Sequence, residues 1–273
     1  MKKAVFLLCF LVALSGCKKN ADTPDWPHRL MNCRVEYLFL RDDIMVPADQ
    51  EVLISQDARQ SAYTYSGESV TRVDGSMVLV PAGTNLNRYL FANNGYDSLV
   101  PGDHSVTCYW KSFDNGVIRT YPLNPYRYYT DSQGRLSRVF KTDGWHPEGY
   151  ELKYIYAGDS IVEQNTDGSV RRTFYQSYGN LRRVITKKYL QGKLFSMHEI
   201  LFYSYDNAPN PFRNRYHLRG AFFRAFSENN YLEYKVNDYG WLTDTTFGIT
   251  AWSRVTMSVG YDSDGYPMFG SYE

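Results

Sequence analysis

The histidines are the residues of this sequence best suited to metal binding or proton transfer, and they stand far apart: His28, His104, His146, His198 and His217. Zinc sites draw on closely spaced histidines and cysteines, and none of these histidines has such a neighbour. His198 precedes Glu199 in a segment typical of a strand, where successive side chains point to opposite faces. The two therefore cannot serve one metal from there, and we expect no metal site and no cofactor.

Nucleophile motifs give equally little support for catalysis. The sequence contains no Gly-x-Ser-x-Gly elbow, and neither Ser177 nor Ser196 has a base at a predictive spacing. The segment Asp262-Ser263-Asp264-Gly265 is better explained as a tight turn than as a calcium loop, because no glutamate follows where an EF-type loop needs one. Paired carboxylates of a hydrolase need only spatial proximity, so the sequence neither supports nor excludes them. We expect a protein that is not an enzyme.

The clearest charge feature runs from Arg171 to Lys193, a segment that contains no acidic residue. Its cationic doublets are Arg171, Arg172, Arg182, Arg183, Lys187 and Lys188. One interpretation is a surface for an anionic partner, such as a lipid phosphate or an acidic glycan. The other interpretation is that the charges protect a solvated or edge strand from aggregation. The charge pattern alone does not decide between these two interpretations.

Trp145 is the aromatic residue that most resembles a binding residue. It lies in the turn-rich segment Asp143-Gly144-Trp145-His146-Pro147, and binding residues concentrate in loops. Its ring could stack on a sugar, whereas most of the other aromatic residues are expected in the core or in cross-strand pairs.

Composition narrows the fold class. The chain has 273 residues, of which 43% are hydrophobic and 22% charged, as in ordinary folded proteins. Its 30 basic and 29 acidic residues give a net charge of +1, which argues against a nucleic-acid binder. The 25 tyrosines and the 16% share of aromatic residues favour strands, because rings pack well on a pleated surface. We therefore predict an all-β protein.

The N-terminus has the order of an export signal. Met1-Lys2-Lys3 is basic, Ala4 to Leu14 is an apolar run too short to span a bilayer, and Leu14-Ser15-Gly16-Cys17 follows. This order resembles a bacterial lipoprotein signal peptide. The resemblance implies removal of 1–16, acylation of Cys17 by chains such as palmitate, and a tether over 17–32. The alternative is an ordinary secretory signal whose cysteine is incidental.

The resemblance extends to outer-membrane lipoproteins of Bacteroidota and implies an outer-membrane address. The residues after Cys17 leave open whether the protein faces the periplasm or the cell surface. With Cys17 acylated and Cys9 removed, Cys33 and Cys108 remain, and two thiols in an oxidising envelope make a plausible disulfide. Two separate buried thiols are the alternative.

Turn residues divide the first half of the mature chain into short strands. The expected strands are Arg34 to Leu40, Glu51 to Ser55, Ala62 to Ser66, Ser76 to Val80, Arg88 to Ala92 and Ser105 to Trp110. This spacing is typical of a small β-sandwich, which we place over 33–121. Whether this half is a separate domain or part of one continuous sheet stays open.

The second half, 122–273, contains a degenerate repeat. Arg127 to Leu136 closely resembles the tyrosine-aspartate (YD) repeat of the Rhs type, with Thr130 in place of the second tyrosine. Weaker copies are Tyr203 to Asn207, Tyr234 to Leu242 and Gly260 to Pro267. In each copy the aspartate is expected to bond its own turn between two strands, which predicts an antiparallel β-meander. Uncharacterised meander lipoproteins of Bacteroidota have a similar arrangement, and this resemblance implies architecture rather than chemistry.

The function expected from these observations is a non-catalytic binding or interaction module of the outer membrane, with a glycan or a polypeptide as ligand. A scaffold or assembly component of an envelope complex is the alternative, and an envelope hydrolase is the third hypothesis. The expected partners are a membrane, through the acyl anchor, and a glycan or a protein, but no nucleic acid.

Overall fold

A computed structural model describes residues 32–34, 51–53, 60–81, 88–114, 117–120, 125–142, 148–263 and 265–268. Within these ranges sixteen strands form one sheet and two more form a small hairpin. The pairs are antiparallel apart from β2 with β5 in the described part of the chain, so the all-β prediction is confirmed. In the same part of the chain there is no helix of the length and apolarity needed to cross a bilayer.

The first seven strands form one end of the large sheet. They are β1 (Asn32–Arg34), β2 (Glu51–Leu53), β3 (Gln60–Ser66), β4 (Ser69–Pro81), β5 (Arg88–Gly102), β6 (Ser105–Asp114) and β7 (Val117–Thr120). Their order is β1-β3-β4-β5-β6, with β2 beside β5 and β7 beside β6. The expected strands from Glu51 onward each overlap an observed one, whereas only Arg34 of the expected strand Arg34 to Leu40 lies within the described residues. The observed β4, β5 and β6 are longer because they continue through the residues expected as turns or ends.

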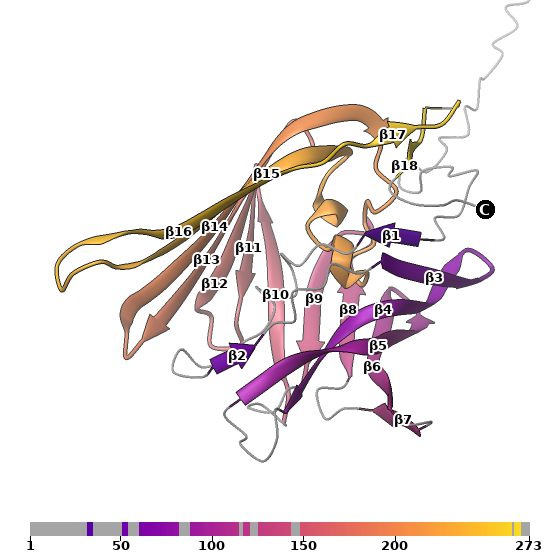
Figure 1. The fold of residues 1–273 in the computed structure, drawn as a ribbon, viewed down its shortest axis with the longest axis horizontal. Helices are drawn as coiled ribbons and strands as arrows, with labels where there is room; N and C mark the ends of the chain where they lie inside the picture. Colours follow the sequence, from indigo (N-terminus) through magenta and orange to yellow (C-terminus); the bar gives the residue numbers. More distant parts are fainter. Residues whose placement is uncertain are drawn as a thin grey trace, which may run out of the picture.

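The remaining strands follow one another in space as they do in sequence. They are β8 (Tyr126–Thr130), β9 (Leu136–Lys141), β10 (Tyr150–Ala157), β11 (Ser160–Gln164), β12 (Val170–Ser177), β13 (Asn180–Leu190), β14 (Lys193–Pro209), β15 (Asn229–Trp241), β16 (Phe247–Thr256), β17 (Gly260–Tyr261) and β18 (Pro267–Met268). The strands β8 to β16 form a meander that bends around the segment 210–228 (Figure 1).

The described strands pair across the expected boundary between the two halves. Strand β6 pairs with β8, and Cys108 lies opposite Tyr126. The sheet order is therefore continuous from β1 to β16. The division into 33–121 and 122–273 as domains stays a prediction.

Two of the four YD-like segments have the predicted turn. The Asp131 carboxylate accepts hydrogen bonds from the backbone N–H groups of Gln133 at 2.9 Å and Arg135 at 3.0 Å, between β8 and β9. In the last copy, the Asp262 carboxylate accepts from the N–H of Tyr266 at 2.8 Å, between β17 and β18. An aspartate that bonds its own turn stabilises the reversal of the chain.

The turn prediction is wrong for the two middle copies. Strand β15 continues through Asp238, and the chain reverses only after Trp241. Strand β14 likewise continues through Asp206. In both cases the aspartate bonds across strands: Asp238 contacts His198 at 2.6 Å, and Asp206 accepts from the Asn230 backbone at 3.0 Å. A tertiary partner thus replaces the turn hydrogen bond.

The core lies on the inner face of the meander, the face turned toward segment 210–228. Cross-strand pairing from β10 to β15 places one registered set of side chains there, which we call the apolar row: Tyr156, Ile161, Phe174, Val184, Ile200 and Val236. Phe174, Val184 and Ile200 are fully buried. Side chains alternate along β10: Leu152 and Tyr154 face the core and are buried, whereas Lys153 and Ile155 are exposed.

Segment 210–228 covers the apolar row. It contains two short 3₁₀ turns, η1 (Arg219–Ala221) and η2 (Arg224–Phe226). The ring of Phe174 lies 4.6 Å from that of Phe226 and 6.3 Å from that of Phe223. Aromatic contacts of this kind bury large areas and dominate core stability.

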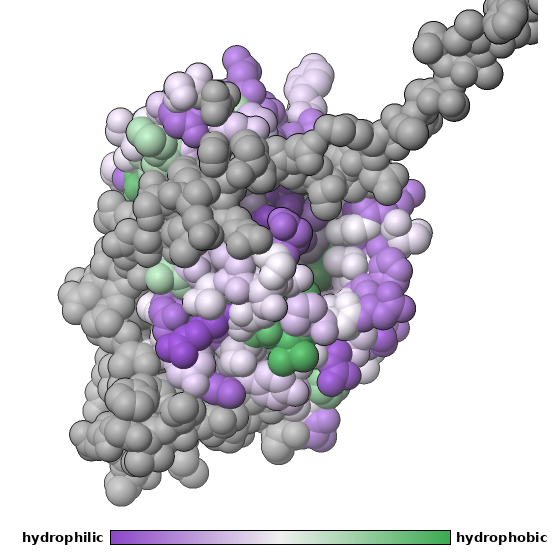
Figure 2. Space-filling view, turned by 90° about the vertical axis from the view of Figure 1, so that its right-hand side faces the viewer, coloured by the Kyte–Doolittle hydropathy of each residue, from purple (hydrophilic) through white to green (hydrophobic). Residues whose placement is uncertain are grey.

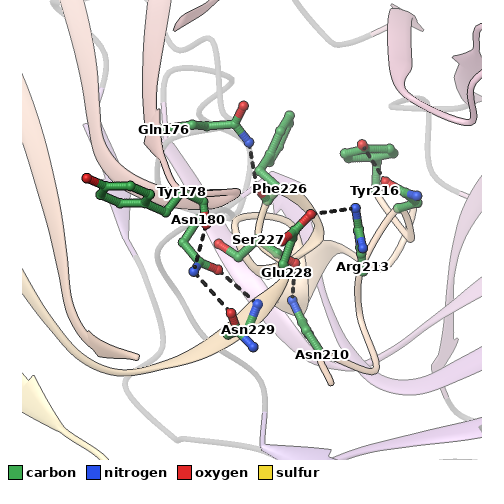
Figure 3. A network of polar contacts seen from close by, with 11 residues as sticks. Gln176, Tyr178, Asn180, Asn210, Arg213, Tyr216, Phe226, Ser227, Glu228 and Asn229 are labelled. Atoms are coloured by element: carbon green, nitrogen blue, oxygen red, sulfur yellow. Dashed lines mark hydrogen bonds and ion pairs between the residues drawn. The ribbon is translucent and has the colours of Figure 1, made fainter. Parts of the chain in front are cut away.

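Polar contacts fix the covering segment to the turn between β12 and β13 (Figure 3). The Gln176 amide donates to the Phe226 carbonyl at 2.7 Å, and the Ser227 hydroxyl accepts from the Leu181 N–H at 3.0 Å. The side-chain amide oxygen (Oδ1) of Asn180 accepts from the Asn229 backbone N–H at 2.9 Å. These bonds satisfy buried polar groups at both ends of the contact.

We expect Gly179→Ala to destabilise the protein more than Gly192→Ala. Both glycines have positive φ in two-residue hairpin turns, at +71° and +78°, so an alanine is strained at either one. At Gly179 a Cβ would also overlap the Glu228 carboxyl group, so that side chain would have to turn away and lose its 3.0 Å ion pair with Arg213, whereas nothing lies within 4 Å at Gly192. Urea denaturation of both variants measures the difference, and equal losses would contradict the close contact between this turn and segment 210–228.

Candidate functional site

A second registered set of side chains crosses the inner face, two residues along each strand from the apolar row. We call it the polar row, and it consists of Tyr154, Glu163, Arg172, Thr186, His198 and Asp238 on β10 to β15. Each member lies directly opposite the next member on the neighbouring strand. Because side chains directly opposite each other are close enough to interact, the row places polar side chains next to one another across six strands.

The row is buried at its β10 to β13 end. The Tyr154 hydroxyl donates to the Glu163 carboxylate at 2.6 Å, and Arg171 donates to the same carboxylate at 2.7 Å. Arg172 lies 3.6 Å from Glu163, and its Nε donates to the Thr186 hydroxyl at 3.3 Å. Burial alone would raise the pKa of Glu163, but Arg172 and Arg171 outweigh it and lower that pKa to about 2. The carboxylate is therefore ionised at neutral pH.

A β-bulge brings two consecutive arginines to this carboxylate. Glu163 lies opposite Arg172 and Gln164 opposite Val170, so Arg171 is the extra residue on β12. In such a bulge two neighbouring side chains can share one face. Arg171 and Arg172 are both buried, which strict alternation along a strand would not allow.

The row opens to solvent at its β14 and β15 end. The His198 Nδ1 lies 2.6 Å from an Asp238 carboxylate oxygen, and both side chains are partly exposed. They line a cleft of about 600 Å³, together with Lys188, Ser196, Trp241 and Thr250 among others. Gly240 lines the same cleft and has no side chain to fill it. A Cβ at this position would lie 3.2 Å from the Thr250 methyl group, a tight contact. The cleft therefore presents hydroxyl, imidazole, ammonium and carboxylate groups together.

The adjacent carboxylate, Glu199, faces the other side of the sheet, as the alternation predicted. It accepts from the Asn237 amide and the Tyr239 hydroxyl, each at 2.9 Å, and lies 2.6 Å from Arg183. Burial opposes ionisation of Glu199, but these partners together lower its pKa. His198 and Glu199 thus belong to two separate networks on opposite faces.

The six predicted cations do not share one surface. Arg171 and Arg172 are buried beside Glu163, whereas Arg182, Arg183, Lys187 and Lys188 are exposed. The Arg182 guanidinium lies 4.6 Å from the Tyr205 ring centre, and Lys188 lines the cleft on the inner face. The sequence did not reveal this separation, because the bulge at Arg171 leaves no recognisable motif.

Several predicted site residues lie outside the described residues. They are Cys17, with 1–16 and the rest of the tether up to residue 31, and Trp145. Cys108 is buried in the core on β6, and the side chain of Cys33 lies outside the described part. Acylation, the disulfide and a binding role of Trp145 therefore stay predictions.

The other described histidines are remote from the cleft. His104 is exposed in the turn before β6, and His217 lies in segment 210–228, where burial and then Arg215 lower the pKa of its ring to about 3. Across the described ranges no three His, Cys, Asp or Glu side chains form a group able to hold a metal ion. The pairing of His198 with Asp238 could not be read from the sequence, because 40 residues separate the two.

Comparisons with known proteins give structural matches alone. No family model matches the chain, and no curated protein matches it by sequence. One similar solved structure is a porin-like protein from Bacteroides uniformis, with 11% identity and a TM-score of 0.40 over 77% of this chain and 79% of that one. Another is a porin-like protein from Bacteroides vulgatus, with 11% identity and a TM-score of 0.38 over 76% and 88%.

Proposed function

We propose that this chain is a non-catalytic, lipid-anchored binding protein of the outer membrane, and that the cleft around His198 and Asp238 binds a glycan. The observation that carries the ligand class is the composition of the cleft. Side chains of Lys188, Ser196, His198 and Asp238 supply both hydrogen-bond donors and acceptors, and sugars offer both in return. The address and the anchor rest on the export signal that ends at Cys17.

A glycan suits this cleft better than an extended polypeptide. Strands β13, β14 and β15 are each paired on both sides, so their backbone groups are already hydrogen-bonded in the sheet. A peptide that binds as an added strand needs an unpaired edge. Recognition in the cleft must therefore use side chains, which is how proteins bind sugars: polar groups fix orientation, and rings such as that of Trp241 contact the apolar sugar faces.

A second function, the scaffold or assembly component, is favoured by β16. Within the described residues β16 is the end of the sheet order and pairs with β15 alone. Its residues from Ile249 to Thr256 are exposed, including Trp252. An exposed strand of this length can accept another chain as an added strand. A stable co-purifying protein, together with the absence of a saturable glycan, would favour this second function.

We expect Asp238→Asn to weaken glycan binding by about tenfold to a hundredfold, because one charged hydrogen bond contributes about 1.5–3 kcal/mol. A glycan array with the full-length protein identifies the ligand, and calorimetric titration measures the affinity. Trp252→Ala is the matched control, because Trp252 lies opposite Asn237 on the other face of the sheet and should leave the affinity unchanged. Equal affinity of wild type and Asp238→Asn would contradict the assignment of the cleft.

A further inference from the structure

Two neighbouring hairpins end at the same edge of the sheet, and their ends carry exposed apolar side chains. Met197 on β14 lies opposite Tyr239 on β15, so the turn that precedes β14 and the turn that follows β15 lie at one end. In Figure 1 these two hairpin ends project at the left of the molecule. The Trp241 Nε1 donates to the Leu194 carbonyl at 2.9 Å and connects one hairpin to the other.

We define the tip surface by five side chains at these ends: Tyr189, Leu190, Phe195, Trp241 and Leu242. They are 42 to 55% exposed, although each is large and apolar or aromatic. On the opposite side of the molecule, which Figure 2 shows, the coloured residues are mainly hydrophilic, and the apolar ones form only small groups. A concentration of exposed apolar side chains at one end of a protein marks a contact surface.

Charge next to the tip surface specifies the kind of partner. Lys187, Lys188 and Lys193 flank the first hairpin end and are exposed, and the chain from Arg182 to Lys193 has no acidic residue. The second hairpin end carries one exposed acid, Asp244. The tip surface thus combines tyrosine, tryptophan and aliphatic side chains with an excess of lysine. This combination is the one found where proteins contact the headgroup region of anionic membranes.

We infer that the tip surface docks onto an anionic lipid membrane, with the aromatic and aliphatic side chains at the level of the headgroups and the lysines against lipid phosphates. Phe195 and Trp241 of the tip surface also line the cleft. The inference goes beyond the proposed glycan site, because it concerns contact of the hairpin ends with lipid and does not use the polar groups of His198 and Asp238. Acyl chains on Cys17 would tether the protein to the bilayer, and an apolar and basic contact of the folded part adds to that attachment. The tip surface supplies such a contact.

Tryptophan quenching by brominated lipids tests the inference. Full-length protein extracted from membranes is reconstituted into vesicles of phosphatidylcholine and phosphatidylglycerol with brominated acyl chains. The indole of Trp241 is at the tip, whereas that of Trp252 lies on β16 further from the turn. Both substitutions are made in protein that carries Trp26→Phe, because Trp26 stands in the expected tether close to Cys17. We expect Trp241→Phe to remove most of the lipid-dependent quenching and Trp252→Phe to leave it unchanged.

Two further variants test the charge and guard against misfolding. Lys187→Glu with Lys193→Glu should reduce quenching in anionic vesicles and bring it to the level seen in pure phosphatidylcholine. Near-ultraviolet circular dichroism confirms that each variant is folded. The inference is overturned if Trp241→Phe is quenched as strongly as the wild type, or if charge reversal has no effect. Because Trp241 also lines the cleft, the glycan proposal is judged by the affinity of Asp238→Asn measured in solution without lipid, and the membrane inference by quenching in vesicles, so the two proposals fail separately.

Discussion

Glu163→Gln should lower the free energy of unfolding by about 3 kcal/mol or more, because it leaves buried arginines without their carboxylate. Glu163 and Arg172 are fully buried, and Arg171 is nearly so. The Glu163 carboxylate lies 2.7 Å from the Arg171 guanidinium and 3.6 Å from that of Arg172. These contacts stabilise charges that water cannot reach. Urea denaturation, followed by near-ultraviolet circular dichroism, measures the loss directly.

The matched control is Arg138→Gln. Arg138 forms an ion pair with Glu151 at 3.1 Å, also between neighbouring strands, but Arg138 is exposed and Glu151 is partly exposed, so water reaches both charges. Exposed pairs of this kind contribute about 1 kcal/mol or less. If Glu163→Gln cost no more than Arg138→Gln, the buried cluster would not contribute to stability as its geometry indicates.

The same carboxylate predicts a pH dependence. The pKa of Glu163 falls from its ordinary 4.5 to about 2 in the folded protein, so the unfolded chain binds the proton more readily. The stabilisation is therefore complete above pH 4.5 and is lost as the pH falls toward 2. In Glu163→Gln this part of the acid dependence should be absent, whereas a wild-type slope in the variant would assign the dependence to other groups.

Phe174→Ala should cost about 3–5 kcal/mol, the largest effect expected from a single truncation in the core. Its ring is fully buried and contacts Phe222, Phe223 and Phe226 of the covering segment. The substitution leaves a cavity between the sheet and that segment, which fixed neighbours on both sides cannot fill.

Tyr175→Ala provides the comparison at the adjacent position. Tyr175 lies on the same strand but faces away from the core and is exposed. Its truncation should cost less than about 1 kcal/mol, as is usual for surface positions. Similar losses for the two variants, measured by urea denaturation, would place segment 210–228 elsewhere than over the inner face.

Local patterns in the sequence predicted the strands well, because side-chain alternation depends only on neighbouring residues. The expected strands Ala62 to Ser66 and Ser105 to Trp110, for example, lie within β3 and β6. The hairpin turns at Gly158, Gly168, Gly179 and Gly192 each contain a glycine with positive φ. Such turns depend on one or two residues that adopt positive φ.

The candidate site depended on information that alternation does not contain. The contact of His198 with Asp238 requires the register of β14 against β15, which the intervening segment 210–228 does not encode locally. The burial of Arg171 beside Arg172 requires a bulge. Beyond a bulge, each residue of the strand points to the sheet face opposite to the one that simple alternation predicts. For this reason the basic segment predicted one cationic surface, whereas the structure divides its cations between the core and the exterior.

The most direct test of the glycan proposal is a crystal structure of the protein with the tightest glycan from the array. We predict density for the sugar in the cleft, with hydroxyl groups within hydrogen-bonding distance of His198 and Asp238 and a ring beside Trp241. Density for the sugar on the opposite face, near Trp252 or Glu199, with an empty cleft, would contradict the proposal.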